Sequence, residues 1–232
     1  MKYYKADSRK ISFREYYDLS RSNSWVLAWV FKIFGIPLKL TSGIPEPQSF
    51  RDNIIEAEVI PPEILAKLNS GILDLKKLGF DQFWFYTLKN SLIGGAAYAV
   101  QALHPSHKTI GKILFVSIKS RENFVFVFVS ELNDGTFFGT TNNRPSFKSP
   151  PRYNILRRLH ANAAQLWELQ QNKLAELSQR NPPKTISSFD QVVGFEDKTS
   201  RMLHENKVSR GIYVEMTDSE VETLRAKLSQ SR

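Results

Sequence analysis

Five basic residues between positions 144 and 158 form the densest group of side chains in this 232-residue sequence that could bind a ligand. They are Arg144, Lys148, Arg152, Arg157 and Arg158. We expect them to surround the start of a long helix, where free backbone N–H groups and the helix dipole also attract anions. The cluster therefore predicts an anion-binding surface, and the alternative is a solvated basic surface without a ligand.

The whole chain is basic, with a formal net charge of +9 at pH 7. Such a charge favours anionic partners, which include acidic lipid headgroups, acidic proteins and nucleic acid. Phe147 and Tyr153, inside the basic cluster, add aromatic surface on which a nucleic-acid base can stack. We expect an anionic surface as the partner, and nucleic acid is a less favoured one. The alternative to both is a basic protein without such a partner.

The histidines and carboxylates offer weaker candidates for chemistry. His104 and His107 share one turn, but no neighbouring carboxylate completes a set of metal ligands, so an exposed turn is the favoured interpretation. His160, beside the apolar face of the predicted long helix, is a candidate general base, and a structural hydrogen bond is the alternative. The carboxylates between 190 and 205, Asp190, Glu196, Asp197 and Glu205, are expected to be solvated.

Motifs that specify a reaction are absent from the sequence. It contains no cysteine, which excludes disulfides, thiolate metal sites and cysteine catalysis. No G-x-S-x-G stretch occurs, and Gly94-Gly95 lacks the spacing of a nucleotide-binding loop. We therefore predict no catalytic residue, no metal and no cofactor. A protein that is not an enzyme is the favoured interpretation, and an enzyme of unknown class is the alternative.

An apolar segment near the N-terminus, residues 25–34, is a candidate anchor through Trp25, Trp29, Phe31 and Phe34. A helix of this length is too short to cross a hydrocarbon core of about 30 Å. It can lie in a membrane interface with its tryptophans at headgroup level, or it can be a buried core helix. We expect a cytoplasmic protein without a transmembrane span, and membrane association is the alternative that this segment leaves open.

The central element that must position these residues is a hairpin between residues 123 and 143. Phe124, Phe126 and Phe128 alternate with valines, so both faces of the strand are apolar and need cover. Asp134-Gly135 is a hairpin turn signal. Short connections join five predicted strands, at 82–88, 92–102, 109–119, 123–132 and 136–142, and such connections permit antiparallel neighbours only.

The predicted fold class is α+β: a five-stranded antiparallel meander covered by helices, with a C-terminal helix-strand-helix unit. Further elements are expected as helices at 12–19, 62–78 and 152–179, a strand at 53–60, and the C-terminal helix 188–206, strand 211–216 and helix 218–229. In the helix 152–179, Ser149 is the expected cap. Composition divides the chain into 1–47, 48–181 and 182–232, with Pro182-Pro183 as the boundary of a C-terminal unit that can pack on the main domain.

From these features we predict a non-catalytic binding or interaction module with a basic anion-binding surface, peripheral to a membrane. Two alternatives stay open. One is a nucleic-acid-binding protein that uses the same cluster. The other is an enzyme of unknown class with a site between the sheet and the long helix, where His160 would act.

Overall fold

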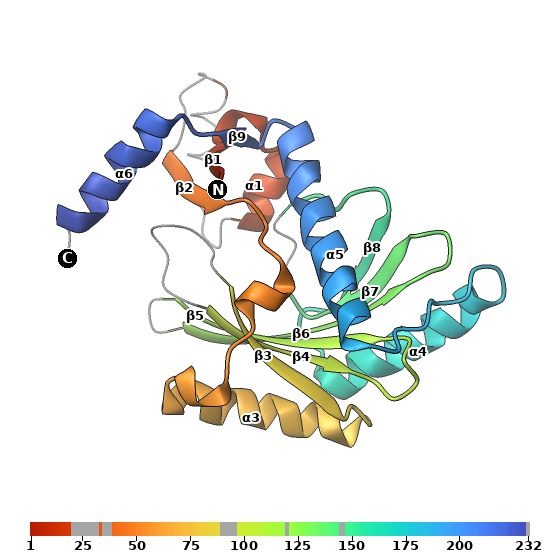
Figure 1. The fold of residues 1–232 in the computed structure, drawn as a ribbon. Helices are drawn as coiled ribbons and strands as arrows, with labels where there is room; N and C mark the ends of the chain where they lie inside the picture. The colour runs from red at the N-terminus through yellow and green to blue at the C-terminus, as the bar shows by residue number, and fades with distance from the viewer. Residues whose placement is uncertain (20–32, 34–38, 89–96, 119–120, 144–146, 231–232) are drawn as a thin grey trace.

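The fold, a computed structural model, is described for residues 1–19, 33, 39–88, 97–118, 121–143 and 147–230 (Figure 1). These residues form a mixed α+β structure with two sheets and five α-helices. The elements are β1 (Tyr3–Asp7), α1 (Phe13–Leu19), β2 (Lys39–Pro45), α3 (Pro62–Lys77), β3 (Gln82–Leu88), β4 (Ala97–Leu103), β5 (Ile110–Ile118), β6 (Arg121–Glu131), β7 (Phe137–Thr141), β8 (Tyr153–Arg157), α4 (Ala163–Ser178), α5 (Phe189–Ser209), β9 (Tyr213–Glu215) and α6 (Asp218–Gln230).

The large sheet has the strand order β3-β4-β5-β6-β7-β8. Strands β3 to β7 pair antiparallel with their chain neighbours, as predicted, and β8 joins the edge parallel to β7. The prediction of a five-stranded sheet is therefore wrong, because residues 153–157 form a strand where a helix was expected. The helix α4 begins only at Ala163, and its cap is Asn162, whose side chain and that of Gln165 form a reciprocal capping box.

Both faces of the large sheet are covered, as the alternating Phe and Val residues of β6 require. Phe126 and Phe128 pack in one core cluster with Leu68 of α3 and Leu166 of α4. On the opposite face, Val129 packs in a second cluster to which α5 contributes three buried residues, Val192, Val193 and Phe195. Figure 1 accordingly shows α3 and α5 on opposite sides of the sheet.

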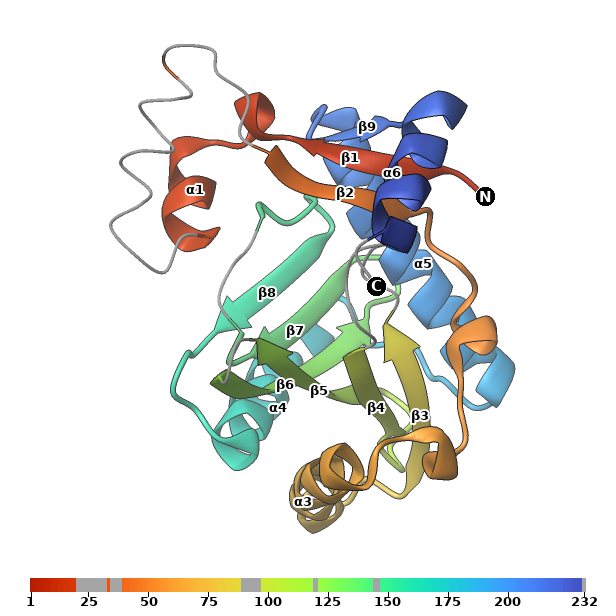
Figure 2. The ribbon, with the colours of Figure 1, turned by 90° about the vertical axis from the view of Figure 1, so that its left-hand side faces the viewer.

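A smaller sheet joins segments from both parts of the chain, in the order β2-β1-β9 with β1 in the centre (Figure 2). The predicted C-terminal helix, strand and helix correspond to α5, β9 and α6. Helix α5 packs on the large sheet, whereas β9 pairs with β1. The C-terminal region therefore contacts both sheets, and the division of the chain into three units stays a prediction.

One predicted strand is absent, and one predicted helix cannot be assessed. In place of a strand at 53–60, the chain forms two 3₁₀ turns, Phe50–Asn53 and Ala57–Val59, with one isolated bridge from Ile54 to Tyr86. Local backbone bonds such as Ile60 N to Ala57 O use groups that a strand would need. The candidate anchor residues Trp25, Trp29, Phe31 and Phe34 lie outside the described residues, and no helix within the described ranges is long and apolar enough to cross a membrane.

We predict that Gly139→Ala lowers the free energy of unfolding by about 1–3 kcal/mol. Gly139 lies in β7 between β6 and β8, and an added Cβ would stand 2.5 Å from the carbonyl oxygen of Phe128 and 2.8 Å from Cδ1 of Ile155. Neither strand can move without loss of pairing. Urea denaturation followed by circular dichroism measures the change.

Gly194→Ala is the matched control, because a Cβ at this exposed position of α5 meets no atom within 4 Å. It should raise the free energy of unfolding by about 0.5–1 kcal/mol, since alanine favours the helix. Equal effects of the two substitutions would contradict the close approach of β8 to Gly139.

Candidate functional site

A groove of about 900 Å³ lies between α1, the segment 147–151 and β8. Three cationic side chains from these three segments line it: Arg14, Lys148 and Arg157. Alternation along β8 places Arg157 on the same face as Tyr153, which also lines the groove. We call this feature the basic groove.

The carboxylate of Glu15 holds the walls of the basic groove together. It is 5% exposed, and it accepts hydrogen bonds from the backbone N–H and hydroxyl of Ser12, at 2.9 and 2.7 Å. The backbone N–H of Lys148 and the guanidinium of Arg210 also donate to it, each at 2.7 Å. Burial alone would raise the pKa of Glu15, but the bonds from Arg210, Lys148 and Ser12 outweigh it and lower the pKa to about 2.

The structure divides the predicted basic cluster. Lys148 and Arg157 line the basic groove, whereas Arg152 and Arg158 are exposed on either side of β8 and do not line it. Arg144 lies outside the described residues. The prediction that these residues surround the start of a helix is wrong, because they precede α4 and lie on a loop and a strand. The positive potential of the groove therefore comes from side chains and not from a helix dipole.

Sequence reasoning missed Arg14, the third cation of the groove. Its neighbour Glu15 is 133 positions away from Lys148 along the chain, and only tertiary packing brings α1 to β8. No local pattern around Arg14 indicates this role.

The histidines do not form a site. His104 Nδ1 lies 2.9 Å from the hydroxyl of Ser106, and its ring packs against Phe80 and Trp167. His107 Nδ1 instead lies 2.9 Å from the carbonyl oxygen of Ile186. His160 is exposed in the turn before α4, not on the helix, and the described residues contain no group of His, Cys, Asp or Glu that could hold a metal.

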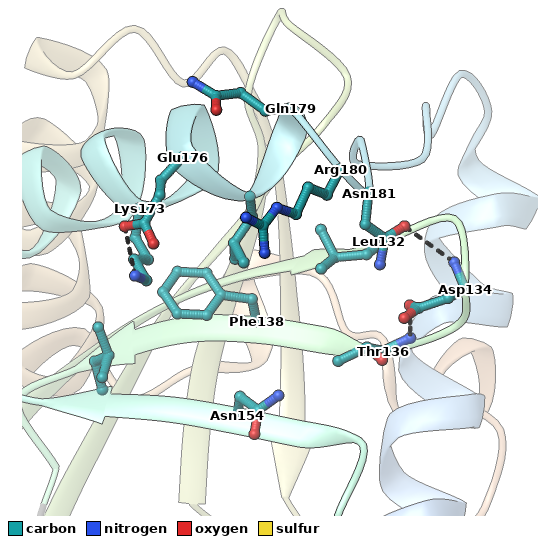
Figure 3. A pocket seen from close by; sticks show the side chains of 12 residues that line it. Leu132, Asp134, Thr136, Phe138, Asn154, Lys173, Glu176, Gln179, Arg180 and Asn181 are labelled. Carbon is teal, nitrogen blue, oxygen red and sulfur yellow. Dashed lines mark hydrogen bonds and ion pairs between the residues drawn. The ribbon is translucent and has the colours of Figure 1, made fainter.

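A second pocket, of about 620 Å³, lies between the β7–β8 edge and the end of α4 (Figure 3). Phe138 forms part of its apolar base, and the side chain of Arg180 points into it. Most of its other polar groups bond to one another: Asp134 N–H donates to Asn181, and Lys173 pairs with Glu176. The described lining of this pocket contains two cationic residues, Lys173 and Arg180, and Lys173 is paired with Glu176. The basic groove gathers three cationic residues in its lining.

Comparison with known proteins found no matching family model, no matching curated protein and no matching solved structure. The function must therefore be argued from the chemistry of the groove and the pockets themselves.

We predict that Glu15→Gln destabilises the protein by about 2–3 kcal/mol at neutral pH and by much less in acid. A pKa of about 2 in the folded state, against 4.5 for an ordinary glutamate, means that folding favours the ionised form. The resulting stability is fully present above pH 4.5 and is lost as the pH falls towards 2. Urea denaturation of both proteins across this range measures the difference.

The control is Asp74→Asn, which removes a half-exposed carboxylate that, among the described residues, forms an ion pair with Lys77 on the same helix. Its effect should stay within about 0.5 kcal/mol at every pH. If the loss of unfolding free energy caused by Glu15→Gln were the same in acid as at neutral pH, the ionised carboxylate of Glu15 would not be the source of this stability.

Proposed function

We propose that this chain is a non-catalytic binding module that holds an anionic partner in the basic groove. The observation that carries the proposal is the convergence of Arg14, Lys148 and Arg157 from three segments on one groove. Glu15 is the one acidic residue among the described residues that line it, and its carboxylate is already bound by Arg210. The groove therefore has a surplus of positive charge at a concave surface, which favours anions.

The groups in the groove support binding more than catalysis. A general acid or base works best with a pKa near the working pH. The pKa of Glu15 is about 2, and four hydrogen bonds occupy its oxygens, so it stays ionised and committed. Burial raises the pKa of Tyr153, and the nearby charge of Glu196 raises it further, so this phenol keeps its proton. Neither group is set to exchange protons with a substrate.

An anionic lipid surface is the partner class that we put first. Arg152 and Arg158, both exposed beside β8, extend the positive surface beyond the groove. A membrane presents many anionic headgroups at once, so charges within and around the groove can act together. The apolar segment with Trp25 and Trp29 would add an interfacial anchor, which remains part of the proposal.

The test is sedimentation with vesicles of phosphatidylserine and phosphatidylcholine, beside vesicles of phosphatidylcholine alone, at low and moderate salt. Wild-type protein should sediment with the anionic vesicles only, and less at higher salt. The double variant Arg14→Glu/Lys148→Glu should lose at least tenfold in apparent affinity. Only side chains change, so the backbone bond from Lys148 to Glu15 is retained.

A matched control reverses one arginine and one lysine elsewhere, as Lys108→Glu/Arg201→Glu. Both residues are exposed and lie outside the groove lining, and the change in net charge is the same. If both double variants lost the same affinity for anionic vesicles, total charge alone would explain the binding, and the basic groove would be rejected as the binding site. Binding to single-stranded nucleic acid but not to vesicles, with a steep salt dependence, would move the proposal to the nucleic-acid alternative.

A further inference from the structure

We infer that a pocket between α5 and the large sheet is a second binding site, for a small uncharged molecule that carries several hydroxyl groups. The pocket has a volume of about 240 Å³. Its polar lining comes from different elements: Tyr86 of β3, Lys112 of β5, Tyr153 of β8 and Glu196 of α5. This site is distinct from the anion-binding role of the basic groove, although Tyr153 lines both.

A buried ion pair stands in the wall of this pocket. Lys112 Nζ lies 2.6 Å from Glu196 Oε2, and the two side chains are 13% and 6% exposed. Removing both charges from water is unfavourable, and apolar residues of similar size often give equal or greater stability at such positions. The pair is therefore poorly explained by stability alone. It also corrects the expectation that Glu196 is solvated.

The same carboxylate has an unused oxygen. Glu196 Oε1 is buried and has no hydrogen-bond partner among the described residues. The amide of Gln101, the direct cross-strand neighbour of Lys112, likewise leaves its nitrogen and oxygen buried without a partner there. Native proteins leave few such atoms, because each one loses its bonds to water. Gln101 does not line the pocket, but Glu196 does, so a molecule bound there could supply the missing partner of Glu196 Oε1.

The chemistry of the lining selects the class of molecule. Lys112 and Glu196 balance each other, so a ligand with a net charge would enter without a counter-ion, at a large desolvation cost. A hydroxyl group suits both partners, since it can donate to Glu196 Oε1 and accept from Lys112. Burial, together with the charge of Glu196, raises the pKa of both Tyr86 and Tyr153, so two phenol groups remain available as donors.

The size and the apolar walls agree with a compact polyol. The pocket is far larger than the roughly 30 Å³ that one water molecule occupies, yet smaller than the roughly 300–1,000 Å³ typical of drug-sized ligands. Phe50, Leu114 and Val127 line it beside the polar groups and can pack against C–H faces. Asp197, the residue after Glu196, fixes the Phe50 wall by accepting its backbone N–H at 2.6 Å. The ligand class is therefore monosaccharide-sized and uncharged.

Saturation-transfer NMR on the full chain tests this with four probes: myo-inositol, glucose, gluconate and leucine. We expect signals from the uncharged myo-inositol or glucose, and none from the anionic gluconate or the zwitterionic leucine. Absence of binding by both uncharged probes at millimolar concentration would overturn the proposal. So would equal binding of all four.

Two variants connect any signal to this pocket. Lys112→Met/Glu196→Leu exchanges the ion pair for apolar side chains, and should keep or raise the urea midpoint while binding of the polyol falls at least tenfold. Ser200→Leu narrows the pocket from the side of α5, leaves the ion pair unchanged, and should also abolish polyol binding. If the double variant does not fold, this single variant shows whether the polyol binds in the pocket. Polyol binding that survives Ser200→Leu would overturn the assignment.

The groove variant Arg14→Glu/Lys148→Glu separates this site from the proposed function. It should bind the polyol as wild type does, because neither residue lines the pocket. Loss of polyol binding in this variant would show that the signal comes from the basic groove, and would overturn the second site.

Discussion

The carboxylate of Glu15 ties together three segments that are remote in sequence: α1, the loop before β8 and the end of α5. Four hydrogen bonds converge on it, and two come from residues 133 and 195 positions away. Because the group is buried, each lost bond would leave a charged oxygen without solvation. The basic groove depends on this clamp, since its cations come from α1, that loop and β8. The same carboxylate pairs with Arg210, and the three cationic residues of the groove are exposed.

Helix α5 contacts the large sheet through both apolar packing and a buried ion pair. Val192, Val193 and Phe195 bury apolar surface against it and supply much of the cover that the valine face of β6 requires. One residue further, Glu196 brings a charge into the same interface, opposite Lys112 of β5. Apolar packing fixes how α5 lies on the sheet, and the polar pair then sits where that packing ends, beside a pocket. A scaffold of this kind holds polar groups in place without help from a flexible loop.

Much of the fold follows from local sequence, and the errors have identifiable causes. The two apolar faces of β6 and the Asp134-Gly135 turn predicted the centre of the sheet. Strand β8 was missed because Leu156, Leu159, Ala163 and Leu166 are spaced as in a helix. Its pairing is decided across the sheet, where Gly139 of β7 leaves room for Ile155. Likewise, Lys148 and Arg157 could be found because basic residues are concentrated in that short stretch of sequence. Arg14 and the Lys112–Glu196 pair could not, because they depend on contacts between residues far apart in the chain.

The small sheet has a consequence for the order of folding. Its central strand, β1, needs β2 on one edge and β9 on the other, and β9 follows β1 by roughly 200 residues. At synthesis rates of about 5–20 residues per second, β1 leaves the ribosome roughly 10–40 s before its second partner exists. During that interval one edge of the nascent β1–β2 pair has open hydrogen-bonding groups, which other chains can pair with. Arrival of β9 closes this edge, so a truncation before residue 213 would leave a protein whose large sheet is complete but whose first strand stays prone to association.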